Sequence, residues 1–169
     1  MFSSNKIQIG SWSFNEIKLE DINMYDEFIK NTEYPANLWS SNFAYLWASG
    51  QSSSRKILWK IIDNLLVTFA YSKKGTLYLM CLPFGRGSPE DITNVLKKCL
   101  MYCYKCNNNN TSKSVIRMVN SMQLEFLRKS PSFNEKFKTI PLVGLEKHFS
   151  IKNLVNLEGK EFRSVRKKI

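Results

Sequence analysis

The clearest pattern in the chain lies between residues 76 and 106, where a continuous apolar run is followed by a helical periodicity. Thr76 to Leu82 is rich in β-branched, aromatic and apolar residues, which predicts a strand buried on both faces. After it, apolar residues recur at the i, i+3, i+4 and i+7 spacing of one helix face: Ile92, Val95, Leu96, Cys99, Leu100 and Cys103. This strand and this helix are expected to form the centre of the core.

The residues between the strand and the helix predict a sharp turn and a well-defined helix start. Phe84 to Ser88 contains two glycines, which interrupt the strand pattern. Ser88 is a favoured N-cap residue, and Pro89 suits the first helical position because its missing N–H would have no partner there. Glu90 and Asp91 complement the positive end of the helix dipole. We therefore expect a helix that begins directly after Ser88.

Upstream, the pattern predicts one strand and two helices. Residues 1–11 show no clear element, and Trp12 to Ile17 predicts a short strand. A helix that opens at Leu19 would place four apolar residues on one face: Ile22, Tyr25, Phe28 and Ile29. A second helix is expected to begin near Ser40 or Ser41, with an apolar side made of Phe43, Leu46 and Trp47.

Three strands are predicted in quick succession between residues 56 and 82. They are Lys56 to Ile62, Leu65 to Ser72 and Thr76 to Leu82. Asp63-Asn64 is a two-residue turn signal, and Lys73-Lys74-Gly75 is a second short connection. An antiparallel meander is the expected result.

After the capped helix, the pattern predicts shorter elements. Asn107 to Asn110 predicts a loop, Ser114 to Val119 a strand, and Ser121 to Lys129 a helix that Pro131 ends. Within this helix Met122, Phe126 and Leu127 are expected to face inward. Two strands are predicted between Phe133 and Ser150, then a helical turn through Leu154, and a new helix from Lys160. The order of elements favours an α/β or α+β fold, with a mixed, mostly antiparallel sheet flanked by helices.

The composition fits one domain and points to anionic partners. The chain has 169 residues, of which 43% are apolar and 13% aromatic, enough for one core. Lys and Arg number 25 against 14 Asp and Glu, which leaves a net charge of +11 and favours RNA, a membrane surface or a phosphorylated cofactor. The sequence shows no secretory leader pattern and no apolar run long enough to span a membrane. We expect a cytoplasmic protein, with peripheral membrane attachment as an alternative.

No catalytic or metal-binding constellation stands out. The four cysteines are Cys81, Cys99, Cys103 and Cys106, and we expect reduced, buried thiols because two of them lie on the apolar helix face. Cys103-x-x-Cys106 resembles a redox or zinc half-site, but there is no second CxxC and His148 is the single histidine. We expect no metal site, and the catalytic residues are not identified.

Several segments resemble one protein family at residue level. They are Phe14 to Asp21, Phe43 to Ala48, Leu82 to Gly87, and Leu154 to Lys160 followed by Phe162 and Arg166. The predicted order of elements also resembles the acyl-CoA N-acyltransferase fold, commonly called GNAT. The family is an uncharacterised bacterial one related to the C-terminal region of phosphatidylglycerol lysyltransferases, in which two GNAT-like domains occur in tandem.

The resemblance implies a domain organisation and a set of partners. Residues 1–157 would form a single GNAT-like domain, and residues 158–169 would begin a basic connector helix to a second GNAT-like domain in cis. Acyl-CoA or aminoacyl-tRNA would be cofactors of a full-length protein, and tRNA or anionic phospholipid head groups would be its partners. The family has an Arg-Asn-His run where this chain has Arg166-Lys167-Lys168.

Two candidate sites follow from the resemblance and from charge. Gly85, Arg86, Gly87 and Ser88 lie where a GNAT enzyme holds the pyrophosphate of acyl-CoA. Leu82 stands where active GNAT enzymes usually have Arg or Gln, so this turn is a degenerate site, and a purely structural turn is the alternative. The second candidate is a basic patch for anions or for inter-domain contact: Lys160, Arg163, Arg166, Lys167 and Lys168.

These observations favour one function and leave two alternatives. The favoured one is the N-terminal half of a tandem aminoacyl- or acyltransferase-like protein, acting as a scaffold or substrate-recognition module that binds no cofactor tightly and is not catalytic alone. The alternatives are a complete small acyl-CoA-dependent N-acyltransferase and a basic RNA-binding module. Affinity for acyl-CoA and the salt dependence of nucleic-acid binding discriminate among the three.

Overall fold

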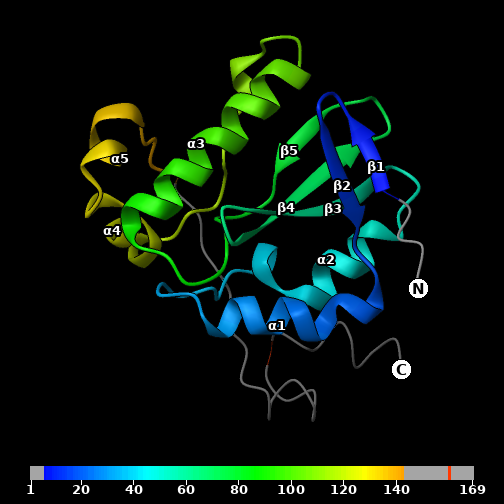
Figure 1. The fold of residues 1–169 in the computed structure, drawn as a ribbon, viewed down its shortest axis with the longest axis horizontal. Helices are drawn as coiled ribbons and strands as arrows, with labels where there is room; N and C mark the ends of the chain where they lie inside the picture. The colour runs from blue at the N-terminus through cyan, green and yellow to red at the C-terminus, as the bar shows by residue number, and fades with distance from the viewer. Residues whose placement is uncertain (1–5, 143–159, 161–169) are drawn as a thin grey trace. The chain divides into compact units, whose positions relative to one another are not determined.

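An antiparallel sheet with the strand order β1-β2-β3-β4-β5 is the centre of the computed structural model (Figure 1). The structure describes residues 6–142 and residue 160. The chain divides into two compact units, residues 1–137 and 138–169, and all the elements below belong to the first. The strands are β1 Lys6–Ile9, β2 Trp12–Glu16, β3 Arg55–Ile62, β4 Leu65–Ser72 and β5 Leu77–Leu79.

The predicted meander of three strands is confirmed. Ile62 pairs with Leu65 across a two-residue turn, in which Asp63 and Asn64 have φ angles of 49° and 64°. Positive φ at both central residues is typical of a type I′ turn, whose twist matches that of the flanking strands. Asp and Asn tolerate this conformation better than most residues, so the dipeptide signal had a physical basis.

β5 differs from the prediction in length and in burial. It spans Leu77–Leu79 only, and it lies at the edge of the sheet, paired with β4 alone. Leu77 and Leu79 are buried, but Tyr78 between them is 36% exposed, so the prediction of a strand buried on both faces was wrong. The apolar run beyond it leaves the sheet, and Phe84 returns to form a single bridge to Leu66.

The start of the chain carries a strand that the hydrophobic pattern did not indicate. β1 pairs with β2 through a tight turn in which Gly10 has a φ of 54°, so the expectation of no element in residues 1–11 was wrong from Lys6 onward. Only Ile7 and Ile9 of β1 contact the core, and both are partly exposed. Two apolar residues in alternation give a weak period-two signal.

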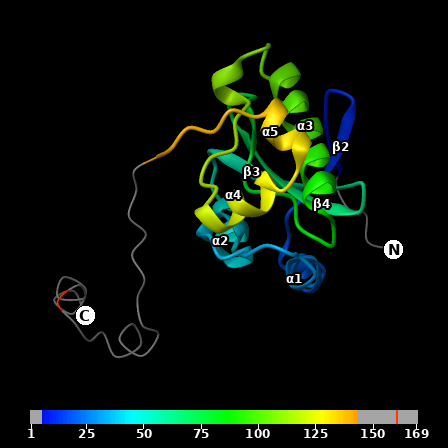
Figure 2. The ribbon, with the colours of Figure 1, turned by 90° about the vertical axis from the view of Figure 1, so that its left-hand side faces the viewer.

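Helices α1 (Ile22–Lys30) and α2 (Phe43–Gly50) lie on one side of the sheet and α3 (Pro89–Cys106) on the other (Figures 1 and 2). Short 3₁₀ turns, η1 Leu19–Asp21 and η2 Trp39–Ser41, lead into α1 and α2. Both helices are therefore confirmed in position. Tyr25, Phe43 and Leu46 are buried, but Ile22 is 40% exposed, so its predicted place on the apolar face of α1 was wrong. The Tyr25 side chain is buried on α1 and donates a hydrogen bond to the Ser41 carbonyl.

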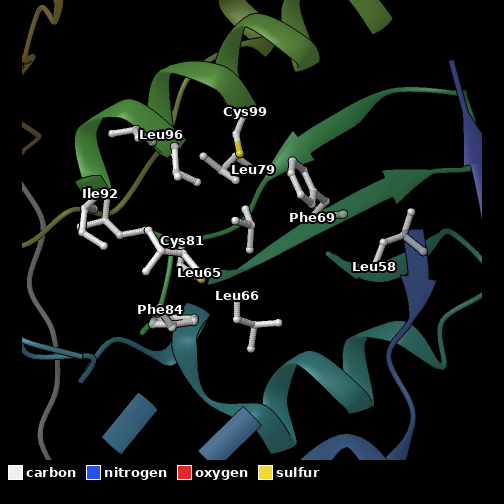
Figure 3. Close-up of a cluster of buried hydrophobic side chains, with 14 of the residues drawn as sticks. Leu58, Leu65, Leu66, Phe69, Leu79, Cys81, Phe84, Ile92, Leu96 and Cys99 are labelled. Carbon is white, nitrogen blue, oxygen red and sulfur yellow. The ribbon is translucent and has the colours of Figure 1, made fainter. Parts of the chain in front are cut away.

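The capped start of α3 is as predicted. The Ser88 hydroxyl accepts the Asp91 N–H at 3.2 Å, and the Asp91 carboxylate accepts the Ser88 N–H at 2.9 Å, which together form a capping box. Figure 3 shows Ile92, Leu96 and Cys99 on the side of α3 that faces the sheet, where Leu79 and Phe69 lie. All five of these side chains are buried, so α3 covers its face of the sheet with the predicted apolar stripe.

The first hairpin is attached to α3 through Tyr102. The Trp12 and Tyr102 rings stack at a centroid distance of 3.8 Å with 4° between their planes. The Tyr102 hydroxyl accepts the Trp12 N–H at 2.9 Å and donates to the Ile9 carbonyl. One side chain therefore joins both strands of the hairpin to the helix.

The strand predicted at Ser114 to Val119 is absent. α3 is followed by η3 Thr111–Lys113, and no strand follows between residues 114 and 142. The Asn107 side chain occupies the outer edge of β5: its carbonyl accepts the Leu77 N–H at 2.9 Å, and its amide donates to the Leu77 carbonyl at 2.8 Å. An additional strand cannot pair with Leu77 while Asn107 holds these groups.

The last elements pack on α3. α4 (Ser121–Arg128) confirms the predicted helix and buries Phe126 and Leu127, but Met122 is 55% exposed and the prediction that it faces inward was wrong. Gln123 is buried instead and donates to the Pro35 carbonyl. Pro131 does not simply end α4: it takes the first position of α5 (Pro131–Lys136), so a strand from Phe133 is also wrong.

The described chain is thus an α+β domain with a five-stranded antiparallel sheet flanked by helices. Its order agrees with the predicted one from β2 through α3, with β1 as an additional strand, and after α3 only α4 agrees. Elements predicted beyond residue 142 lie outside the described residues, Lys160 excepted. None of the helices in residues 6–142 combines the length and apolar character that a membrane span requires.

Candidate anion-binding site at the glycine turn and α3

The turn between β5 and α3 is held tightly from two sides. Gly85 is buried with a φ of 127°, a conformation that side-chain-bearing residues rarely adopt. A Cβ atom there would lie 3.1 Å from a Phe28 ring carbon and 3.2 Å from a Leu65 methyl carbon. Glycine is therefore required by both conformation and space, and the turn is fixed between α1 and β4.

The backbone donors that would hold a pyrophosphate are partly engaged by the protein itself. The Gly85 N–H donates to the Thr32 hydroxyl at 2.9 Å, and the Ser88 N–H donates to the Asp91 carboxylate. Pro89 has no N–H to offer. Of the four predicted turn residues, Gly85 and Ser88 therefore use their backbone N–H groups within the protein, and only Arg86 and Gly87 keep theirs for a ligand.

A carboxylate already lies at the positive end of α3. The hydroxyl and N–H of Ser88 both donate to Asp91, and these hydrogen bonds hold the pKa of the Asp91 carboxyl below its usual value. This negative charge complements the helix dipole in the position where an external anion would otherwise be attracted. The helix start alone is a poor anion site.

A pocket of about 610 Å³ lies beside the turn, on the solvent side of α3. It runs between the β3–β4 turn and the exposed face of the helix, and Arg86 is part of its wall. Its lining among the described residues consists of Asp63, Asn64, Leu65, Arg86, Asp91, Asn94, Lys97, Lys98 and Met101. Of the predicted turn residues, only Arg86 belongs to it.

The charges of this pocket are unevenly paired. Lys98 forms an ion pair with Asp63, and Asp91 is engaged by Ser88. Arg86 and Lys97 form no ion pair with any residue that the structure describes. The lining therefore presents two cationic side chains that are available to an anion.

The second predicted site cannot be placed in the same way. Lys160 is exposed, whereas Arg163, Arg166, Lys167 and Lys168 lie outside the described residues. The basic patch at residues 160–168 stays a prediction.

The cysteines are free, as expected. Cys81, Cys99 and Cys103 are buried and Cys106 is partly exposed. Burial raises the pKa of the Cys81 and Cys103 thiols to about 12 and raises that of Cys99 as well. At neutral pH these three sulfurs are protonated and poor nucleophiles.

No group of three or more metal-ligating side chains occurs within residues 6–142. His148 lies outside the described residues, so the sequence-based statements about it are unchanged. The tyrosine hydroxyls of Tyr25 and Tyr34 donate to backbone carbonyls, at 3.0 Å to Ser41 and 2.5 Å to Pro83, and burial raises the pKa of both. They are held in structural hydrogen bonds.

Sequence reasoning identified Arg86 but missed the rest of the pocket. Asn94, Lys97 and Met101 follow one another at three- and four-residue spacing on the face of α3 opposite its apolar stripe. That face is readable from the sequence, but the position of the β3–β4 turn beside it depends on tertiary packing. Comparison with models of protein families, with curated proteins and with solved structures gave no match.

Proposed function

We propose that this domain is a recognition module of an acyl- or aminoacyl-transferring protein and does not bind acyl-CoA tightly by itself. The observation that carries the proposal is that the glycine turn donates backbone hydrogen bonds to acceptors within the protein itself. Gly85 and Ser88 donate to protein acceptors, and the Asp91 carboxylate occupies the positive helix end.

One further feature is consistent with a module that is not catalytic alone. The three buried thiols are protonated at neutral pH, since burial raises their pKa values. The resemblance to the tandem GNAT-like family supplies the link to acyl or aminoacyl transfer, to a second domain in cis, and to tRNA or anionic phospholipid as partners. The net charge of +11 favours both of these partners.

Calorimetry with acetyl-CoA tests the first half of the proposal. We expect a dissociation constant no tighter than about 1 mM, which corresponds to about −4 kcal/mol. A micromolar constant, together with release of free thiol in the presence of an amine acceptor, would overturn the proposal and favour a small N-acyltransferase.

The recognition half of the proposal has a separate test. Binding to tRNA and to vesicles that contain phosphatidylglycerol or only phosphatidylcholine should be measured at two salt concentrations. We expect saturable binding to tRNA or to the anionic vesicles that weakens as salt rises. Absence of binding to both would contradict a recognition role.

A further inference from the structure

We propose that the pocket between the β3–β4 turn and α3 binds a small phosphorylated molecule, with Arg86 and Lys97 as the groups that contact its phosphate. The inference rests on the lining of the pocket and does not depend on the proposed function. It concerns a site on the solvent side of α3, whereas acyl-CoA in a GNAT enzyme would meet the backbone of the glycine turn.

The walls of the pocket are fixed by backbone geometry. The Asp63-Asn64 turn closes a fully paired hairpin, with Ile62 opposite Leu65. Arg86 follows a glycine that is buried between Phe28 and Leu65. The third wall is an 18-residue helix whose opposite face is in the core. The pocket is open to solvent, since all of its lining residues except Leu65 are exposed, and its volume of about 610 Å³ is that of a small-ligand site.

Two of the three cationic side chains that line the pocket have no ion-pair partner among the described residues and can contact a ligand. Lys98 of α3 pairs with Asp63 at the tip of the hairpin. Arg86 and Lys97 have no such partner among the described residues. A guanidinium binds two phosphate oxygens with its planar donors, and an ammonium adds a point charge.

The remaining lining favours a small polar phosphate ester over a long polyanion. Asn64 and Asn94 supply amide donors and acceptors, and Asp63 and Asp91 supply carboxylate oxygens that accept from hydroxyl groups. Two carboxylates would repel a continuous polyanion such as RNA, but they suit a ligand with one phosphate and several hydroxyls. The chemical class is therefore a phosphate monoester of a small free sugar.

Amide chemical shifts of the full chain, titrated with ribose 5-phosphate, test the inference. We expect saturation with a dissociation constant of about 1 mM or tighter and shifts concentrated at Asn64, Arg86, Asn94 and Lys97. Ribose should not bind, and inorganic phosphate should bind at least about tenfold more weakly, since it lacks the hydroxyls that meet the amides and carboxylates. Equal affinity for inorganic phosphate would contradict the sugar part of the inference.

A matched pair of double variants separates this site from general electrostatics. R86Q/K97Q and K73Q/K74Q each remove two positive charges, and Lys73 and Lys74 lie exposed on the β4–β5 turn. We expect the first pair to weaken ribose 5-phosphate binding by about tenfold or more and the second by less than about twofold. All four side chains are exposed, so thermal unfolding should show that both proteins are folded.

Two results would overturn the inference. One is an equal loss of affinity in the two double variants, which would mean that the net charge of the surface attracts phosphate. The other is that a single-stranded RNA oligomer binds tightly and displaces ribose 5-phosphate, and that both double variants weaken this RNA binding equally. As an independent check, affinity should rise between pH 5 and pH 7, because a phosphate monoester gains its second charge near pH 6.

Discussion

Replacing Asn107 by alanine should destabilise the protein by about 3 kcal/mol, because Asn107 closes the open edge of the sheet. Its side chain makes two hydrogen bonds to the peptide groups of Leu77, at 2.9 Å and 2.8 Å, and it is only 7% exposed. Each buried donor or acceptor left without a partner costs about 1 to 3 kcal/mol. Two such groups give a loss of about 2 to 6 kcal/mol. We expect a value in the lower half of this range, because water at the edge of the sheet can replace part of the lost hydrogen bonding.

Urea unfolding followed by tryptophan fluorescence measures this loss. Asn94→Ala is the matched control, since Asn94 is exposed on α3 and the same substitution there should change the free energy of unfolding by less than about 0.5 kcal/mol. The m value should stay constant, so that the change in midpoint reports stability alone. If Asn107→Ala is as stable as Asn94→Ala, Asn107 does not close the edge.

Asn107→Asp adds a test with a defined sign. The ionised carboxylate cannot donate to the Leu77 carbonyl and would repel it, so the pKa of the introduced carboxyl should be higher in the folded than in the unfolded state. The deficit relative to wild type is therefore greatest above the folded-state pKa and should shrink as pH falls from 7 to about 4, where the protonated group can donate again. A deficit that grows on acidification would refute the reasoning.

Three further predictions concern the glycine turn, the acidic start of α3 and the thiols. Gly85→Ala should lower the free energy of unfolding in urea by about 3 kcal/mol, because both φ and the contacts with Phe28 and Leu65 oppose a Cβ. Gly75→Ala should cost about 1 kcal/mol, since Gly75 has a φ of 77° but its nearest atom is 3.8 Å away. Similar losses in the two variants would mean that the Gly85 turn rearranges to accommodate a Cβ. Hydrogen bonds from Ser130 and Ser88 lower the pKa values of Glu90 and Asp91 respectively, so the stability that the two carboxylates contribute is complete above about pH 5 and is lost as pH falls through the folded-state pKa values. In the double variant Glu90→Gln/Asp91→Asn, the free energy of unfolding should therefore fall less steeply on acidification than in wild type. An identical pH dependence would contradict this. Native alkylation followed by mass spectrometry should label Cys106 well before Cys81, Cys99 and Cys103, and rapid labelling of Cys99 or Cys103 would mean that α3 presents a different face to the sheet.

The elements with strong local signals were predictable from the sequence. α3 has a serine N-cap, a proline at its first position and an apolar stripe from Ile92 to Cys103, and all three features act within the helix itself. The β3–β4 hairpin was equally clear because Asp63 and Asn64 favour the positive φ angles of its turn. In both cases the residues that determine the element are adjacent in the chain.

The elements that failed depend on distant partners. The β-rich segment at residues 114–119 has the composition of a strand, but the edge it would pair with is occupied by Asn107 from the end of α3. β1 becomes a strand because β2 and Tyr102 offer it partners, not because of its own pattern. Propensity describes what a segment can form, and tertiary contacts decide what it does form.

The same limit applies to the candidate site. Arg86 was identified from the glycine turn, whereas nothing in the sequence separates Lys97 from Lys98 and Lys105 on the same helix. What distinguishes it is the β3–β4 turn, which lies more than 30 residues earlier and forms the opposite wall of the pocket. No local pattern encodes that proximity.

The attachment of the first hairpin through Tyr102 also bears on the order of folding. The hydrogen bond to Ile9 joins residues 93 apart in sequence, whereas β3, β4 and β5 are connected by turns of a few residues. Closing the longer loop has a larger entropic cost, so contacts of this separation form more slowly than a local meander. The meander and α3 are then expected to assemble first, and the N-terminal hairpin to dock onto a surface that already exists. In kinetic terms, we expect removal of the Tyr102 hydroxyl to speed unfolding more than it slows folding.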